Sequence, residues 1–142
     1  MIEAQLWQIY QHSYFQGVKR QSPYHKITGS NGGAIISLWN PFGQTLSEEQ
    51  NRRRTRAFMR YLRQKRYIFN LLWGGNEDMS YRELSVFIPC SKKQAQRLSA
   101  HFSQLAFYYV GVSGRVSLHC TQGTMPLCMV SKHLKYRWLT GL

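Results

Sequence analysis

Acidic residues are scarce in this sequence of 142 residues, which has 6 Asp and Glu against 19 Lys and Arg and a formal net charge of +13. Three of the acids, Glu77, Asp78 and Glu83, lie close together, and no acidic residue follows Glu83. Such an excess of positive charge concentrates polyanions around a protein and speeds its encounters with them. We therefore expect a polyanionic partner, either RNA or DNA, with an acidic protein as the alternative.

Long hydrophobic runs are also missing, because no apolar segment approaches the roughly 20 residues that a membrane-spanning helix needs. Residues 1–16 lack the charged start and the apolar centre of a signal peptide. We expect a cytoplasmic protein without a membrane partner. A hydrophobic content of 43% is enough to bury a core at this length, so residues 1–142 are predicted to form a single domain.

The cysteines are few and irregularly spaced, at Cys90, Cys120 and Cys128. An odd number without regular spacing argues against a disulfide framework. His119 and His133 could join Cys120 and Cys128 as zinc ligands, but no C-x-x-C pair is present and the spacing fits no common zinc template. We expect neither a metal nor another cofactor.

Motifs of catalysis are absent as well. The glycine-rich segment 29–33 is not followed by the Lys-Ser/Thr pair of a phosphate-binding loop, and no G-x-S-x-G or G-x-G-x-x-G occurs. Glu83 with Asn51 and Gln104 could orient a water, but it has no second acid, metal set or paired histidine beside it. We assign no catalytic residue and favour a binding protein, with an enzyme or receptor for a small phosphorylated ligand as the alternative.

One segment of the chain carries much of the positive charge. Between residues 52 and 66 there are eight Lys and Arg and no carboxylate. The preceding segment 47–50 (SEEQ) predicts a helix start, because Ser47 and Gln50 can form a capping box while Glu48 and Glu49 favour the positive end of the helix dipole. The helical period then places an apolar face, made by Thr55, Phe58, Met59 and Leu62, beside an arginine face.

An arginine face of this kind suits phosphate, because each guanidinium is a rigid fork of donors that stays charged. The simpler interpretation is a solvated helix face that aids solubility. We predict nucleic-acid binding, or association with a ribonucleoprotein, through phosphate contacts. The predicted contact residues are Arg52, Arg53, Arg56, Arg60, Arg63, Lys65, Arg66, Lys135 and Arg137.

The order of elements predicts an α+β domain with a mixed sheet, built from hairpins, and two or three helices on one face. Helices are expected at 2–15, after Ser47 and at 92–103. The last segment, 121–142, is expected to be a basic tail or an extra helix that packs by Leu134, Trp138 and Leu139. Strands are expected at 24–28, 34–39, 67–73, 84–88, 106–112 and 116–120.

Several short motifs occur in a fixed order along the middle of the chain. They are Trp39-Asn40-Pro41, Leu46-Ser47, Asn51-Arg52-Arg53-Arg54, Glu83-Leu84-Ser85 and Phe102-Ser103-Gln104-Leu105-Ala106. Over about residues 33–110 this set resembles the bacterial family called domain of unknown function 3293. The resemblance implies the same order of elements and a bacterial cytosolic setting, and it implies no activity.

Asn51 is a polar residue on the apolar face of the predicted helix, so it needs a hydrogen-bonding partner. In one interpretation it bonds the loop at Asn40 and holds the junction between strand and helix. In the other it belongs to a site for a small phosphorylated ligand beside the helix N-terminus. If Arg54 points inward, we expect it to pair with Glu83. The residues of this possible ligand site are Asn40, Gln44, Asn51, Arg54, Glu83 and Gln104.

Overall fold

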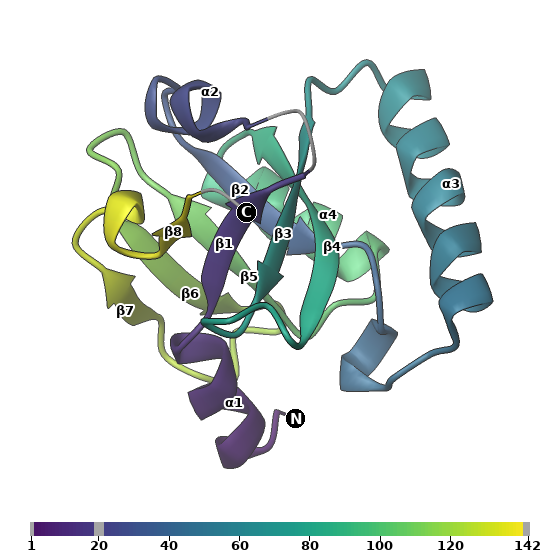
Figure 1. Ribbon diagram of the computed structural model, residues 1–142. Coiled ribbons are helices and arrows are strands. Elements are labelled where there is room, and N and C mark those ends of the chain that lie inside the picture. Colours follow the sequence, from purple (N-terminus) through teal and green to yellow (C-terminus); the bar gives the residue numbers. More distant parts are fainter. Residues whose placement is uncertain (1, 19–21, 141–142) are drawn as a thin grey trace.

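The computed structural model describes residues 2–18 and 22–140, which form a curled sheet of eight strands with helices around it (Figure 1). The strand order is β7-β6-β5-β2-β4-β3-β1-β8. Neighbouring strands are antiparallel, except that β8 runs parallel to β1. The strands are β1 (Tyr14–Gly17), β2 (Gly33–Ser37), β3 (Asn70–Gly75), β4 (Arg82–Pro89), β5 (Ala106–Val110), β6 (Val116–Cys120), β7 (Cys128–Ser131) and β8 (Trp138–Leu139).

The helices of the described residues differ greatly in length, and α3 is the longest. The α+β class and the mixed sheet that the sequence predicts are confirmed. The helices are α1 (Ala4–Gln11), α2 (Tyr24–Thr28), α3 (Glu48–Gln64) and α4 (Lys92–His101), with short 3-10 turns η1 (Pro41–Gly43) and η2 (Leu134–Tyr136).

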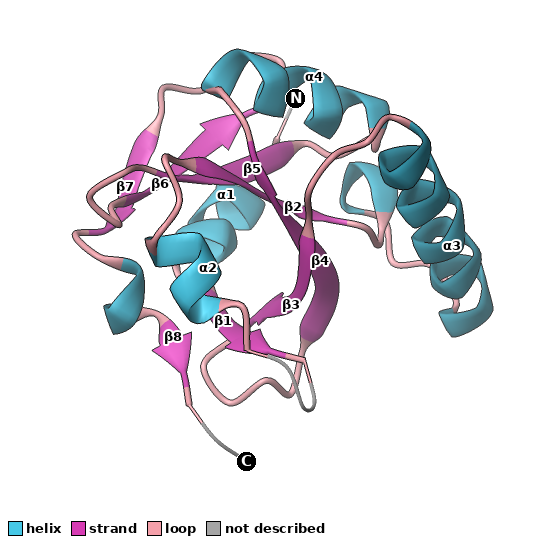
Figure 2. Ribbon diagram, turned by 90° about the horizontal axis from the view of Figure 1, so that it is seen from above, coloured by secondary structure: helices cyan, strands magenta, loops and turns pink. Residues whose placement is uncertain are grey.

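These helices cover both faces of the sheet, whereas the sequence analysis placed them on one. Trp7 of α1 and Ile27 of α2 belong to a buried cluster inside the curl. Leu62 of α3 and Leu98 of α4 belong to a second cluster on the outer face. Figure 2 shows this division, with α1 and α2 within the curl and α3 and α4 outside it.

The central strands explain why both faces need cover. In β2, Ile35 packs in the inner cluster while Ala34 and Ile36 pack in the outer one. In β4, Phe87 and Val86 divide in the same way. A strand that is apolar on both faces must be covered on both, so helices on one side alone would leave half of each strand in water.

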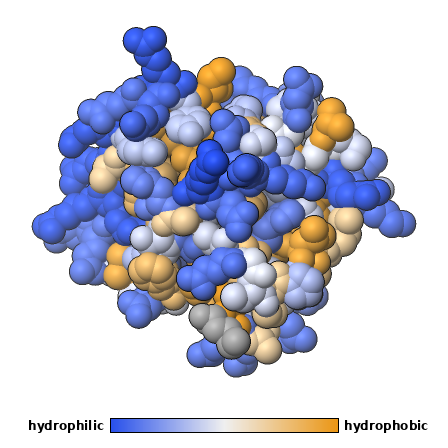
Figure 3. Space-filling view, turned by 180° about the vertical axis from the view of Figure 1, so that it is seen from behind, coloured by the Kyte–Doolittle hydropathy of each residue, from blue (hydrophilic) through white to orange (hydrophobic). Residues whose placement is uncertain are grey.

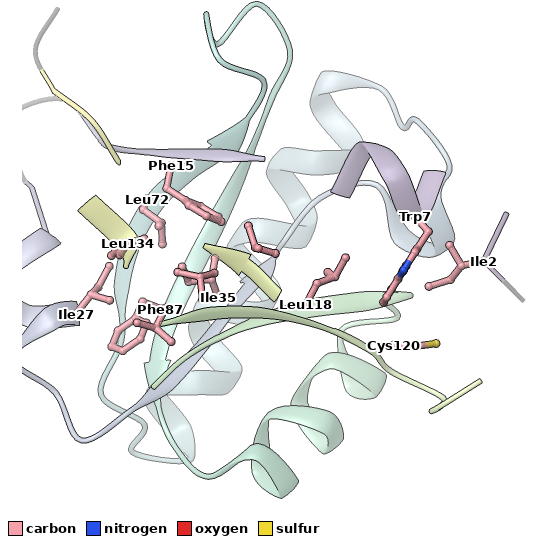
Figure 4. Packing of buried hydrophobic residues seen from close by; sticks show 13 residues of the cluster. Ile2, Trp7, Phe15, Ile27, Ile35, Leu72, Phe87, Leu118, Cys120 and Leu134 are labelled. Atoms are coloured by element: carbon pink, nitrogen blue, oxygen red, sulfur yellow. The ribbon is translucent and has the colours of Figure 1, made fainter. Parts of the chain in front are cut away.

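The inner cluster is a dense aromatic and aliphatic core. Phe15, Ile35, Leu72 and Phe87 come from the adjacent strands β1, β2, β3 and β4, and each is at most 2% exposed. Figure 4 shows these side chains pointing toward one another, with Trp7 of α1 farther along the curl. The inner core therefore ties the N-terminal elements to the middle of the sheet.

Residues 24–28, predicted as a strand, form helix α2 instead. Both edges of β2 are already paired, one with β4 and the other with β5, so no edge is left for a hairpin with residues 24–28. Pro23 stands at the helix N-terminus, and the Thr28 hydroxyl donates to the Tyr24 carbonyl at 3.1 Å. The prediction of a strand at 24–28 was wrong because strands distant in sequence occupy both edges of β2.

The N- and C-terminal segments join in a single edge of the sheet. The helix predicted over 2–15 ends at Gln11, and residues 14–17 form β1. The segment 121–142, predicted as a tail or a helix, supplies β7, η2 and β8 within its described part, and β8 pairs with β1. Leu134 is fully buried, as expected, while Trp138 and Leu139 are half-buried.

Candidate functional site

Helix α3 begins where the sequence predicts. The Ser47 hydroxyl accepts from the Gln50 backbone N–H at 3.1 Å, and the Gln50 side chain accepts from the Ser47 N–H at 3.0 Å. This capping box satisfies two donors of the helix start. Glu48 and Glu49 lie in the first turn, where their charges complement the helix dipole.

One face of α3 holds the helix to the rest of the protein. Leu62 is fully buried, and the Trp39 indole N–H donates to the Thr55 hydroxyl at 2.9 Å. Farther along, the Tyr61 ring stacks on the His101 ring of α4 with centroids 4.1 Å apart. These contacts fix the orientation of α3, so its opposite face is directed to solvent.

The solvent-directed face of α3 carries the predicted arginines, and we call it the α3 basic face. Arg52 and Arg53 are exposed but form ion pairs with Glu48 at 3.6 Å and Glu49 at 2.9 Å, one turn earlier. The remaining three of this face have no carboxylate partner within the described residues. They are Arg56, Arg60 and Arg63, which are all exposed.

Two more predicted cations lie at the C-terminal end of the same helix. Lys65 is the C-cap residue, and Arg66 follows it with a left-handed backbone φ of 61°. Both side chains are exposed, and Lys65 Nζ lies 6.0 Å from the centroid of the Tyr61 ring. Cations are favoured at this end because the helix dipole is negative there. Lys65 and Arg66 therefore add two exposed cations at the C-terminal end of α3, beyond the α3 basic face.

Lys135 and Arg137 do not share this surface. Both Figure 1 and Figure 2 place η2 and β8 on the side of the molecule opposite α3. The Arg137 guanidinium donates to the carbonyls of Gln11, Ser13 and Val130 at 3.1, 3.0 and 3.2 Å. Arg137 thus joins three main-chain segments, which is a structural role, while Lys135 is exposed on a separate surface.

Helix α4 adds a cation that the sequence analysis did not select. Arg97 is exposed and lies one turn before His101, which stacks on Tyr61 on the packed side of α3, so Arg97 flanks the α3 basic face and does not belong to it. In the view from behind, strongly hydrophilic side chains cover the side where α3 lies and continue across the middle of the face, over α4 (Figure 3). The feature of the sequence that could have indicated a basic surface on α4 is the absence of any acid from residues 92–101. We call the α3 basic face together with Arg97 the two-helix basic surface.

The polar residues of the possible ligand site meet at the junction between β2 and α3. Asn51 and Asn40 are 5% and 6% exposed and bond each other twice. Asn51 Oδ1 accepts from the Asn40 backbone N–H at 3.0 Å, and Asn51 Nδ2 donates to Asn40 Oδ1 at 3.0 Å. Asn40 Oδ1 also accepts from the Leu46 N–H at 2.9 Å. Asn51 therefore makes the junction contact that one of the two interpretations predicts.

Glu83 extends this network from strand β4. Its carboxylate accepts from the Ser37 hydroxyl at 2.6 Å, from Asn40 Nδ2 at 3.0 Å and from the Tyr81 hydroxyl. Burial and then the Glu83 charge raise the pKa of Tyr10 to about 12. Burial, the hydrogen bond to Glu83 and its charge also raise the pKa of Tyr81. Both phenols stay protonated at neutral pH, so neither supplies an anionic base.

Arg54 points inward but does not pair with Glu83, which corrects the predicted ion pair. Its Nε donates to the Leu38 carbonyl at 3.2 Å, and its Nη2 donates to the Phe102 carbonyl at 2.6 Å. Gln104 likewise donates to a main-chain carbonyl, that of Trp39, at 2.7 Å. Arg54 and Gln104 thus donate to main-chain carbonyls just after β2 and just after α4, where the regular pairing of the backbone ends.

The same junction holds three non-glycine residues in left-handed backbone conformations. They are Asn40, Phe42 and Ser103, with φ values of 52°, 55° and 59°. The Phe42 N–H donates to the Ser103 carbonyl at 2.8 Å, so two of the strained positions are joined directly. Such conformations persist only where neighbouring contacts determine them strongly. We call Asn40, Asn51, Arg54, Glu83 and Gln104 the junction clamp, since they supply those contacts.

Gln44 is the exception among the predicted ligand residues, because it is exposed and lies outside the clamp. Within the clamp, every buried side-chain nitrogen or oxygen among the described residues has a hydrogen-bond partner. A ligand would have to break these bonds to reach the polar groups, and each broken bond costs free energy. The geometry therefore favours a structural role for the clamp.

Tyrosine titration tests the electrostatics of this junction. The raised pKa of Tyr10 means that the folded state keeps a proton that the unfolded state loses near pH 10. We expect the free energy of unfolding to decrease as the pH rises from about 10 to about 12. In Glu83→Gln the pKa of Tyr10 should be lower, and this decrease should be shallower. Urea unfolding at several pH values measures this decrease in the parent protein and in Glu83→Gln. Equal decreases in the two proteins would contradict an effect of the Glu83 charge on the pKa of Tyr10.

The described residues contain neither a membrane-crossing helix nor a metal-binding cluster. Among residues 2–18 and 22–140, no helix is both long enough and apolar enough to cross a membrane. In the same residues no three His, Cys, Asp or Glu side chains come together as a metal site would require. The possible zinc set with Cys120 and Cys128 is therefore not assembled in the described part of the chain.

Fold and site together define a small α+β protein in which a long, basic helix is fixed to a curled sheet by a polar clamp. A model of the family described as protein of unknown function (DUF3293) matches residues 36–107, which is half of the chain. The chain therefore belongs to this family. The matched segment runs from β2 to β5 and contains the whole of α3, α4 and the junction clamp. Searches of curated proteins and of solved structures gave no significant match.

Proposed function

We propose that this protein binds nucleic acid through the two-helix basic surface, mainly by phosphate contacts. The observation that carries the proposal is the row of exposed arginines on α3, Arg56, Arg60 and Arg63, without carboxylate partners in the described residues. A face maintained only for solubility would serve equally well with mixed charges. Exposed guanidinium groups without a carboxylate partner remain free to form paired hydrogen bonds with phosphate oxygens.

The spacing of these arginines suits contacts along a phosphate backbone. From Arg52 to Arg63 the face extends about 16 Å along the helix axis, at 1.5 Å per residue. Neighbouring arginines on it are three or four residues apart, which places their Cβ atoms about 5–6 Å from each other. Several phosphates can therefore be contacted at once by one face of one helix.

The same surface offers little for reading bases. The half-buried ring of Tyr61 stacks on His101, and the exposed Phe and Tyr rings of the described residues, those of Phe42, Tyr81 and Tyr136, lie outside the two helices. Recognition of single strands uses rings that are open to stack on bases. We therefore propose binding that is governed by phosphate charge and depends little on base sequence.

The affinity for nucleic acid should depend steeply on salt. If Arg56, Arg60, Arg63 and Arg97 each neutralise one phosphate of a duplex, a rise from 50 to 200 mM salt should weaken binding by about 150-fold. Fluorescence anisotropy with labelled duplex DNA, single-stranded DNA and structured RNA measures this. Absence of binding to all three at the lower salt concentration would exclude the proposal.

Binding experiments of the same kind distinguish two alternative functions. An acidic protein partner would be indicated if polyglutamate bound at least as tightly as nucleic acid under the same conditions. A small phosphorylated ligand at the junction clamp is less favoured, because the side chains of the clamp already have partners. The proposed setting is the bacterial cytoplasm, and the three cysteines are free, as is usual in a reducing compartment.

A further inference from the structure

A cavity of about 380 Å³ lies between the first turns of α4 and the end of β6, away from the α3 basic face. This volume falls in the range of about 300–1,000 Å³ that is typical of small-molecule pockets. Its walls come from α4, β5, β6 and the loop that follows β6. The residues that matter for its chemistry are Lys92, Lys93, Phe107, His119, Met125 and Leu127.

Part of the cavity wall is apolar or aromatic. The rings of Phe107 and His119 stack with centroids 5.1 Å apart and planes 8° from parallel. Leu127 is 60% exposed, and Met125 is partly buried beside it. An apolar side chain as exposed as Leu127 gains free energy when a ligand covers it, at about 25 cal/mol per Å² of buried area.

The polar groups of the cavity are positive or neutral. Lys92 and Lys93 are exposed at its rim, and no acidic residue lines it. Burial lowers the pKa of His119, and the Lys92 charge lowers it further, so the imidazole is neutral at pH 7. His119 Nε2 also lies 2.8 Å from the Ser117 hydroxyl, which fixes the ring. The cavity thus combines two ammonium groups with an apolar interior.

From this arrangement we propose that the cavity binds a small organic anion. A carboxylate or phosphate group contacts Lys92 and Lys93, and a compact apolar or aromatic body lies against Leu127 and Met125. A few charged groups that fix orientation within apolar walls are the usual composition of such sites. This site is separate from the two-helix basic surface, and its occupancy does not require nucleic acid.

The test is an NMR titration with phenyl phosphate as the probe, followed at the Met125 methyl group and the His119 ring. We expect saturable shifts at both residues and a higher pKa of His119 in the complex, because a nearby anion favours the imidazolium. Inorganic phosphate, which has only the anionic group, and benzyl alcohol, which has only the aromatic ring, serve as controls. Both should bind at least tenfold more weakly than phenyl phosphate.

Variants locate the site. Lys92→Gln with Lys93→Gln should abolish saturable binding, whereas Arg97→Gln, a charge change on the same helix outside the cavity, should leave it unchanged. Leu127→Ser should weaken phenyl phosphate and leave inorganic phosphate unaffected. The proposal is overturned if phenyl phosphate gives no saturable shift, if inorganic phosphate binds equally well, or if the double lysine variant retains binding. None of these results bears on nucleic-acid binding, which is measured separately.

Discussion

Replacing Arg56, Arg60 and Arg63 with Gln should reduce the affinity for duplex nucleic acid by roughly 10²–10³-fold at 50 mM salt. Each of these exposed side chains lacks a carboxylate partner among the described residues, so each is free to neutralise a phosphate. Gln has nearly the same helix propensity as Arg, so the substitutions leave α3 intact. Anisotropy measures the affinity, and circular dichroism confirms that the helix persists.

A charge-matched control separates the position of the charges from their number. Lys26→Gln, Lys132→Gln and Lys135→Gln together remove three exposed cations that lie outside α3 and α4. Net charge falls by the same amount in both variants, so long-range attraction is weakened similarly. The control should lose less than tenfold in affinity. Equal losses in the two variants would show that net charge alone binds the polyanion and that α3 has no special role.

Asn51→Ala should lower the free energy of unfolding by about 1–3 kcal/mol. Asn51 is 5% exposed, and its removal leaves the Asn40 backbone N–H buried without its acceptor. It also loosens Asn40, whose left-handed backbone depends on the clamp. Urea unfolding followed by tryptophan fluorescence measures the change.

Gln44→Ala is the matched control, because Gln44 is exposed in the same loop and lies outside the clamp. Its effect should stay within about 0.5 kcal/mol. If Asn51→Ala is as stable as the parent protein and instead abolishes a thermal shift caused by a small phosphorylated metabolite, Asn51 is a ligand residue. That result would replace the clamp with the ligand site of the alternative interpretation.

Elements with strong local signals could be predicted from the sequence. The capping box at Ser47 predicted the start of α3, and α4 lies within the helix predicted at 92–103. Strand β6 occupies residues 116–120 as predicted. The need of Asn51 for a hydrogen-bonding partner also followed from a local rule for polar groups on an apolar helix face, but the rule left the Asn40 loop and a ligand as alternatives.

Features that depend on distant partners could not be predicted in the same way. Arg54 donates to carbonyls of Leu38 and Phe102, which lie in separate segments, and nothing in the sequence near residue 54 indicates either one. The position of Arg137 depends on the pairing of β8 with β1, which joins the two ends of the chain. Arg137 was predicted to contact nucleic acid from its charge alone, whereas in the fold its guanidinium binds main-chain carbonyls away from α3.

The cavity beside α4 also could not be predicted from the sequence. His119 was considered only as a zinc ligand, because sequence spacing cannot reveal that its ring stacks on Phe107 beneath two lysines of a helix 26 residues earlier. The signal that could be seen was the absence of acids after Glu83. It indicates that any pocket in this half of the chain has no carboxylate of its own.

The most direct test of the central claim is the salt dependence of duplex binding in the parent protein and the two charge-matched variants. The slope of the logarithm of affinity against the logarithm of salt concentration counts the phosphates neutralised. The account predicts that the slope becomes less negative by about 2.7 in the variant lacking Arg56, Arg60 and Arg63 and changes by less than about 1 in the lysine control. Equal slopes in all three proteins would contradict binding through α3.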